Sequence, residues 1–162
     1  MVREPSPLGT AGCLALVPDL EDTFLVMNAD ILTTLDYRAL VAAHRASGAV
    51  LTIAAVERRE RLEWGVLHAA ADGRLEAYIE KPERSDWVSM GVYVCEPAVL
   101  EHVPHGERLD MPDLVKRLMA NDGLVNVFRS SDYWLDLGHP QDYVRACEDF
   151  DKRRTEFLPQ LA

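Results

Sequence analysis

The chain has 162 residues, 48% of them hydrophobic, and a formal net charge of -10 at pH 7. That length and hydrophobic content suit a single domain, residues 1–162, with a substantial core. The excess of acidic residues argues against nucleic acid or an anionic membrane as a partner, because both require clustered Lys and Arg.

The sequence also bears on the cellular compartment. No segment is long and apolar enough to span a bilayer, and the first residues lack the apolar core of a signal peptide, so we expect a cytoplasmic protein. The three cysteines, Cys13, Cys95 and Cys147, are far apart and lie among apolar neighbours. This spacing predicts reduced thiols in the core and no metal site.

The first predicted element is a turn of small residues that leads into an apolar helix ending near Leu16. Two prolines stop any preceding structure, and Gly9 and Gly12 would let a ligand approach the backbone closely. Free amides at the start of a helix attract anions or the edges of a base. A glycine turn of this kind is also a common simple connector, so both interpretations stay open.

Residues 24–33 (FLVMNADILT) form an apolar run that carries one carboxylate, Asp30. Continuous hydrophobicity predicts a strand buried on both faces, as in a parallel sheet covered by helices. Ligands of such sheets bind beyond the carboxyl ends of the strands, which places Asp30 where chemistry would occur. Alternatively, Asp30 caps a turn or the helix that begins near Asp36.

The next elements indicate the fold class. Asp36 is a plausible N-cap for a helix that closes near Gly48, and residues 49–56 form a second buried strand. Strand, helix and strand in this order predict a parallel crossover unit and therefore an α/β protein. We interpret the charged residues 57–63 as a solvated turn.

A β-hairpin is predicted where Asp72-Gly73 separates two strand-like runs, residues 64–67 and 75–79. The second run ends in Glu80-Lys81-Pro82, and the proline holds the two charged side chains at a strand end. A surface ion pair is the alternative interpretation of Glu80 and Lys81. A further strand covers residues 88–96, and Gly91 inside it suggests that something approaches the backbone there.

The last third of the chain supplies a second carboxylate. A short helix is expected from Pro97 and a longer one from Met111, closed by Gly123, followed by a strand over residues 124–128. Residues 133–140 then place Asp136 within an apolar turn. A helix from Gln141 is expected to direct four side chains to the core and to continue through the basic run 152–154. These four side chains are Tyr143, Ala146, Cys147 and Phe150.

Several motifs together resemble a known family. They are E-P-S-P-L-G-T-A-G at 4–12, N-A-D at 28–30, W-G-V at 64–66, E-K-P at 80–82, S-M-G-V-Y at 89–93, M-P-D-L at 111–114 and Y-W-L-D-L-G at 133–138, followed by Pro140 and Asp142-Tyr143. Each is weak alone, but their joint order covers nearly the whole chain. The chain resembles the later two-thirds of a sugar-1-phosphate nucleotidyltransferase, similar to mannose-1-phosphate guanylyltransferases and glucose-1-phosphate thymidylyltransferases.

The resemblance implies a reaction and a set of residues. Such enzymes join a nucleoside triphosphate to a sugar 1-phosphate and release pyrophosphate, with Mg²⁺ or Mn²⁺ as cofactor. By resemblance, Asp30 and Asp136 bind the metal, Glu80 binds sugar hydroxyls and Lys81 contacts the sugar's phosphate. The remaining residues implied are Gly65, Ser89 and Gly91 for the sugar phosphate and Leu8, Gly9, Thr10, Ala11 and Gly12 for the nucleotide. Ser89 stands where relatives commonly have Asn, so the sugar is not identified.

One departure affects catalysis. The family's glycine-rich loop, whose arginine and lysine hold the triphosphate, precedes the region where this chain starts. The resemblance therefore implies a three-layer, Rossmann-like α/β nucleotidyltransferase fold with a mixed sheet that lacks its first strands and this loop. We expect little pyrophosphate release from the chain alone and only weak binding of metal. We also expect a homo-oligomer or a partner chain that supplies the absent part.

Three hypotheses follow. The chain is a truncated or split part of an active nucleotidyltransferase that serves glycan synthesis, or a non-catalytic sugar-phosphate-binding or regulatory subunit paired with a complete homologue. In the third, it is a fragment with no function of its own. A glycine-rich segment with Arg and Lys in the neighbouring reading frame would favour the first or third hypothesis.

Overall fold

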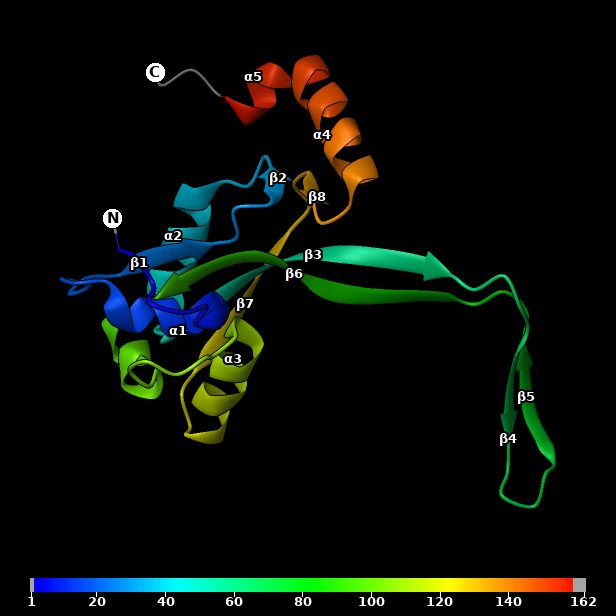
Figure 1. Cartoon of the computed structure of the whole chain (residues 1–162). Coiled ribbons are helices and arrows are strands. Elements are labelled where there is room, and N and C mark those ends of the chain that lie inside the picture. The colour runs from blue at the N-terminus through cyan, green and yellow to red at the C-terminus, as the bar shows by residue number, and fades with distance from the viewer. Residues whose placement is uncertain (1, 159–162) are drawn as a thin grey trace.

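A four-stranded mixed sheet forms the centre of the computed structural model, which describes residues 2–158 (Figure 1). The strand order is β1-β6-β3-β7, formed by β1 (Phe24–Met27), β6 (Glu83–Cys95), β3 (Leu51–Arg61) and β7 (Val125–Ser130). Strand β3 runs parallel to β7 and antiparallel to β6, which is also antiparallel to β1. The α/β class with a mixed sheet is confirmed. The predicted crossover from β1 to β3 also occurs, with β6 inserted between the two strands.

Helical segments cover both faces of this sheet, so the fold has three layers. On one face lie α1 (Gly9–Gly12), η1 (Cys13–Leu16), η2 (Pro97–His102) and α3 (Met111–Ala120). Their apolar side chains form one buried cluster with Leu51 and Cys95 of the sheet. On the other face, Leu40 of α2 (Tyr37–Ser47) packs with Ala54 and Val92 in a second cluster.

Helix α2 shows how the local sequence sets an element's ends. The Asp36 carboxylate accepts hydrogen bonds from the amides of Arg38 and Ala39 at 2.9 and 3.0 Å, which caps the first turn. Gly48 follows the helix in the left-handed conformation, with φ of 64°, and ends it. Both predicted boundaries are therefore present.

The run at residues 24–33 differs from the prediction. Strand β1 ends at Met27, and residues 31–33 form a separate strand, β2 (Ile31–Thr33). Within the described part of the chain, β1 is an edge strand that pairs with β6 alone, and Leu25 and Met27 are 46% and 51% exposed. The expectation of one strand buried on both faces was wrong, because apolar composition does not report how many neighbours a strand has.

Strand β2 pairs with β8 (Trp134–Asp136) in a short antiparallel ladder, and the chain then continues into α4 (Pro140–Lys152) and α5 (Arg154–Phe157). The predicted helix from Gln141 exists, but it does not continue through the whole basic run. Arg153 breaks it and pairs with Glu156 through two hydrogen bonds of 3.1 and 2.6 Å. Among residues 2–158, no helix is long and apolar enough to cross a membrane.

Helix α4 lies beyond β8 and does not pack on the central sheet (Figure 1). Ala146 is buried, but Tyr143 and Cys147 are exposed and Phe150 is half-buried. The prediction that all four face the core was therefore wrong, and so was the prediction of a core thiol at Cys147. Cys95 does lie in the core, where burial raises the pKa of its thiol to about 12.

A long two-stranded arm extends from the sheet (Figure 1). Residues 57–61 continue β3 and pair with residues 83–87 of β6, and the hairpin of β4 (Val66–Ala69) and β5 (Leu75–Ile79) forms the arm's end. The predicted hairpin is present, whereas the solvated turn expected at residues 57–63 was wrong for residues 57–61. Side-chain hydrogen bonds support the strand here, because Glu57 accepts from Arg59 of its own strand and from Ser85 of the opposite strand.

Candidate functional site

Asp30 directly precedes β2 and Asp136 is the last residue of β8, so their backbones are adjacent at one end of the β2–β8 ladder. Ile31 is the register partner of Asp136, and the Leu137 amide donates a hydrogen bond of 2.8 Å to the Asp30 carbonyl oxygen. Both aspartates are exposed. The Asp136 carboxylate is oriented by the Gly138 amide, which donates to Oδ1 at 2.7 Å. Two carboxylates that are distant in sequence are thus brought to one edge of the domain.

The side chains available as metal ligands at this edge determine which cation it can bind. Among residues 2–158, no three or more His, Cys, Asp or Glu side chains form a group that would enclose a metal ion. Magnesium is usually held by one or two carboxylates together with substrate phosphates and water. Asp30 and Asp136 therefore fit Mg²⁺ that binds together with a phosphorylated ligand, and fit poorly as a complete site for the ion alone.

A cavity of about 430 Å³ begins beside Asp30. It is lined by Val26, Met27, Asn28, Ala29 and Asp30 at the end of β1, and by Thr10 from the glycine turn. This volume lies within the range of small-molecule pockets, roughly 300–1,000 Å³. The turn and the end of β1 therefore form one concave surface, as the sequence-based assignment of both segments to one site requires.

Asn28 is a residue of this cavity to which the sequence analysis gave no role. Its amide donates a hydrogen bond of 2.9 Å to the Gly91 carbonyl oxygen, and its side chain lies directly against the Gly91 Cα. Gly91 has φ of 73° and no room for a Cβ, which would be 2.8 Å from Asn28 Nδ2. The glycine inside the predicted strand was the signal: it marked a close approach, and the approaching group is Asn28.

The amides of the glycine turn are not free, so the expectation that free amides there attract an anion or the edge of a base was wrong. Those of Ala11 and Gly12 donate to the Leu109 carbonyl oxygen at 2.9 Å, and that of Thr10 donates to Asp110 Oδ1 at 3.2 Å. Leu8, Ala11 and Gly12 are also buried. The part of the turn that remains accessible to a nucleotide is therefore Gly9, which is half-buried, and Thr10, which is exposed.

The predicted sugar-phosphate residues of the arm lie apart from this cavity. Glu80 and Lys81 connect β5 to β6, at the root of the hairpin, and Figure 1 places the hairpin away from β2 and β8. The Tyr78 hydroxyl donates to Glu80 Oε2 at 3.0 Å, and Lys81 Nζ is 3.6 Å from Glu63 Oε2. Gly65 lies under the Tyr78 ring. The structure thus gathers these three residues together but separates them from Asp30 and Asp136.

Ser89 lies on β6 between these two groups. Its hydroxyl donates to the Tyr93 hydroxyl at 3.3 Å and accepts from the Gly91 amide at the same distance. The residue as a whole is exposed, although both of these hydrogen bonds are partly buried.

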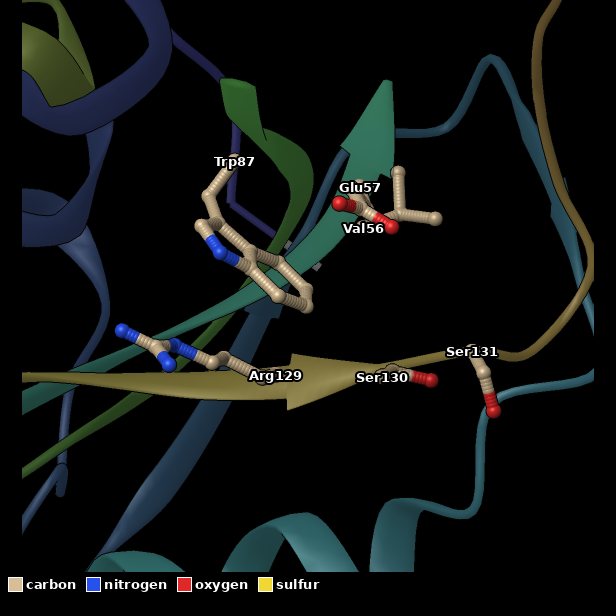
Figure 2. A pocket seen from close by; sticks show the side chains of 6 residues that line it. All are labelled: Val56, Glu57, Trp87, Arg129, Ser130 and Ser131. Atoms are coloured by element: carbon tan, nitrogen blue, oxygen red, sulfur yellow. The ribbon is translucent and has the colours of Figure 1, made fainter. Parts of the chain in front are cut away.

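A second cavity, of about 390 Å³, opens where β7 leaves β3, and sequence analysis gave no signal for it (Figure 2). The Arg129 guanidinium lies 5.1 Å from the centre of the Trp87 ring, in cation–π contact. The Glu57 carboxylate also faces this cavity, and hydrogen bonds from Ser85 and Arg59 lower its pKa. Because these partners already bind the carboxylate, it is a poor proton acceptor, and we assign the cavity no chemistry.

Comparisons with known proteins agree with this fold. A family model described as nucleotidyl transferase matches residues 1–153. Mannose-1-phosphate guanyltransferase of Schizosaccharomyces pombe is 33% identical over 150 residues, which are 87% of this chain and 41% of the relative. Mannose-1-phosphate guanylyltransferase of Mycobacterium tuberculosis is 32% identical over 154 residues, which are 91% and 43% of the two chains.

A solved structure is similar over the same region. HddC from Yersinia pseudotuberculosis complexed with GMP-PN is 25% identical and superposes with a TM-score of 0.62, covering 91% of this chain and 64% of that chain. The chain therefore spans less than half the length of the two curated relatives and about two-thirds of the solved one. Because the family model matches nearly every residue, the chain belongs to the nucleotidyl transferase family.

Proposed function

We propose that the chain carries metal-, nucleotide- and sugar-phosphate-binding residues of a sugar-1-phosphate nucleotidyltransferase. The observation that supports this most strongly is that the backbones of Asp30 and Asp136 are adjacent, beside a cavity lined by Asp30 and Thr10. The named activity of the two curated relatives favours GTP and mannose 1-phosphate as the substrates. The nucleotide sugar formed would supply glycan synthesis.

The chemistry of the proposed reaction assigns tasks to the side chains. A phosphate oxygen of the sugar 1-phosphate attacks the α-phosphorus of the nucleoside triphosphate. The bond between the α-phosphorus and the oxygen that bridges it to the β-phosphate breaks, and pyrophosphate leaves with that oxygen. Asp30 and Asp136 would hold Mg²⁺, which offsets the negative charge of the reacting phosphates. Thr10 and the backbone of residues 26–29 would position the nucleotide, and positioning supplies much of the rate in phosphoryl transfer.

The proposal also places a requirement on the arm. Lys81 is assigned to the sugar's phosphate and Glu80 to the sugar hydroxyls, and both lie at the root of the hairpin. For these roles, the arm must bend toward the β2–β8 ladder when substrates bind. Lys81 has φ of 43°, an unfavourable backbone conformation for a residue with a side chain, so the chain is already strained where such bending would be needed.

The test is a pyrophosphate-release assay with GTP, mannose 1-phosphate and MgCl₂. It compares the 162-residue chain with the same chain supplied with the glycine-rich N-terminal segment of a homologue, covalently or as a separate polypeptide. We expect turnover with the added segment and little without it, because that loop binds the triphosphate. Asp30→Asn and Asp136→Asn should abolish turnover. Asp86→Asn, which only breaks a surface ion pair with Arg84, should not.

The alternative outcomes are distinct. A folded, segment-supplied protein that releases no pyrophosphate from any nucleoside triphosphate with any sugar 1-phosphate contradicts the proposed reaction. If it still binds mannose 1-phosphate, a non-catalytic binding subunit becomes the better assignment. Full turnover by Asp30→Asn or Asp136→Asn would contradict the metal-site assignment while leaving the reaction intact.

A further inference from the structure

The glycine turn is held in place by the segment that precedes α3. The Ala11 and Gly12 amides both donate to the Leu109 carbonyl oxygen, and the Leu109 amide donates to the Leu8 carbonyl oxygen, each at 2.9 Å. The two segments approach so closely that a Cβ on Gly9 would lie 2.6 Å from the Leu109 carbonyl oxygen. The turn and the start of α3, far apart in sequence, therefore pack as one unit.

Thr10 forms two further hydrogen bonds with this segment, one to the Asp110 side chain and one from the Met111 amide, and we call this pair the Thr10–Asp110 clasp. The Thr10 amide donates to Asp110 Oδ1 at 3.2 Å, and Thr10 Oγ1 accepts from the Met111 amide at 2.8 Å. Asp110 occupies the N-cap position of α3, yet its side chain makes no capping bond to that helix. Thr10 supplies the cap in its place.

The clasp fixes the direction of the Thr10 hydroxyl. Because Oγ1 accepts the Met111 N–H, the hydroxyl hydrogen points elsewhere, and no described residue accepts a hydrogen bond from it. Thr10 also lines the cavity that ends at Asp30, and it is the exposed residue of the turn. The hydroxyl is therefore a hydrogen-bond donor for a ligand in that cavity.

We propose that Asp110 is a positioning residue of the nucleotide site: it fixes the Thr10 backbone so that the Thr10 hydroxyl donates to the nucleotide. This inference rests on the proposed function, because it assumes that a nucleotide occupies the cavity. Asp110 itself does not line the cavity. Its Oδ2 is 3.4 Å from the Arg108 guanidinium, in an exposed ion pair of the kind that contributes little stability.

The experiment measures binding of GMP to the 162-residue chain in MgCl₂ by titration calorimetry, for the wild type, four variants of the clasp and one control variant. Asp110→Ala and Thr10→Val each remove one hydrogen bond of the clasp, and we expect GMP affinity to fall about three- to ten-fold. Asp110→Asn keeps an Oδ1 acceptor and Thr10→Ser keeps the hydroxyl, so both should bind GMP within about two-fold of the wild type.

Asp36→Ala is the matched control. It removes a carboxylate that accepts two amide hydrogen bonds at the start of α2, remote from the turn. We expect it to lower the melting temperature as Asp110→Ala does, but to leave GMP affinity unchanged. Equal losses of GMP affinity in both variants would show that Asp110 acts only through stability and would overturn the inference.

Amide hydrogen exchange separates this inference from the proposed function. In Asp110→Ala, the amides of residues 10–12 should exchange faster, while those of α2 keep the wild-type rate. Unchanged exchange in the turn would overturn the positioning role whatever the GMP result. A third outcome is that turn exchange is faster in Asp110→Ala but the folded wild type binds neither GMP nor GTP. This result would overturn the nucleotide site itself and, with it, the assignment of Asp110 to that site.

Discussion

Gly91→Ala should be unusually destabilising, because two separate costs arise at one position. Gly91 has φ of 73°, and an alanine Cβ would lie 2.8 Å from Asn28 Nδ2 and 2.9 Å from Asn28 Cγ. Real Cβ contacts are essentially never this short, so Asn28 must move. Because Asn28 lines the cavity beside Asp30, its movement would also change the shape of the candidate site.

The structure provides a way to separate the two costs. A left-handed backbone costs an L-residue about 1–2 kcal/mol, and overpacking a close contact typically adds about 1–3 kcal/mol. Gly48 has φ of 64°, and a Cβ there meets nothing within 4 Å. Gly48→Ala should therefore show the backbone cost alone, about 1–2 kcal/mol. Gly91→Ala should exceed it by about 1–3 kcal/mol.

Urea unfolding followed by circular dichroism measures both variants. The double variant Asn28→Ala/Gly91→Ala removes Asn28 Nδ2 and Cγ, the two atoms nearest the new methyl, and leaves only Asn28 Cβ at 3.3 Å. Relative to Asn28→Ala, it should be destabilised by less than Gly91→Ala is relative to the wild type, and by an amount close to that of Gly48→Ala. If Gly91→Ala costs the same as Gly48→Ala, the Asn28 contact contributes nothing, and the argument that Gly91 is needed for close packing fails.

Two further predictions concern titratable groups. At about pH 8, a maleimide should label exposed Cys147 in the native protein and Cys95 only after unfolding. The reason is that burial shields Cys95 and raises the pKa of its thiol to about 12. Equal labelling rates of the two cysteines in the native protein would contradict the buried position of Cys95. Hydrogen bonds from Thr23 and His44 hold the Glu96 pKa below its usual 4.5, so the ionised carboxylate contributes stability at neutral pH that is lost as the pH falls below about 4.5. The free energy of unfolding should therefore decline more steeply in the wild type than in Glu96→Gln between about pH 5 and pH 3, and parallel declines would contradict this role for Glu96.

Local signals in the sequence predicted local features well. Asp36 and Gly48 mark the two ends of α2, because an N-cap carboxylate and a left-handed glycine act within a few residues of themselves. Asp72-Gly73 likewise marks the turn between β4 and β5. In each case, the residues that determine the helix end or the turn lie within that helix end or turn.

The errors arose where a distant segment decides the outcome. The charged residues 57–61 extend β3 because residues 83–87 of the opposite strand pair with them, and their own composition does not indicate this. The amides of the glycine turn are occupied because Leu109 and Asp110, about a hundred residues later, bind them. Hydrophobicity at residues 24–27 could not show that β1 has one neighbour in the described sheet.

The proposed site consists of parts that are positioned in different ways, and this has a consequence for its assembly. The Thr10–Asp110 clasp and the β2–β8 ladder hold Thr10, Asp30 and Asp136 to the body of the domain, so the nucleotide and metal part is preformed. Glu80 and Lys81 belong to the arm, which continues into the body through β3 and β6 (Figure 1). The arm also contacts the body at its base, where Trp87 meets Arg129 of β7 and Arg58 meets Trp134 of β8. Under the proposed function, the sugar-phosphate part is therefore completed by movement of the arm, and the cost of that movement opposes binding of the sugar phosphate rather than of the nucleotide.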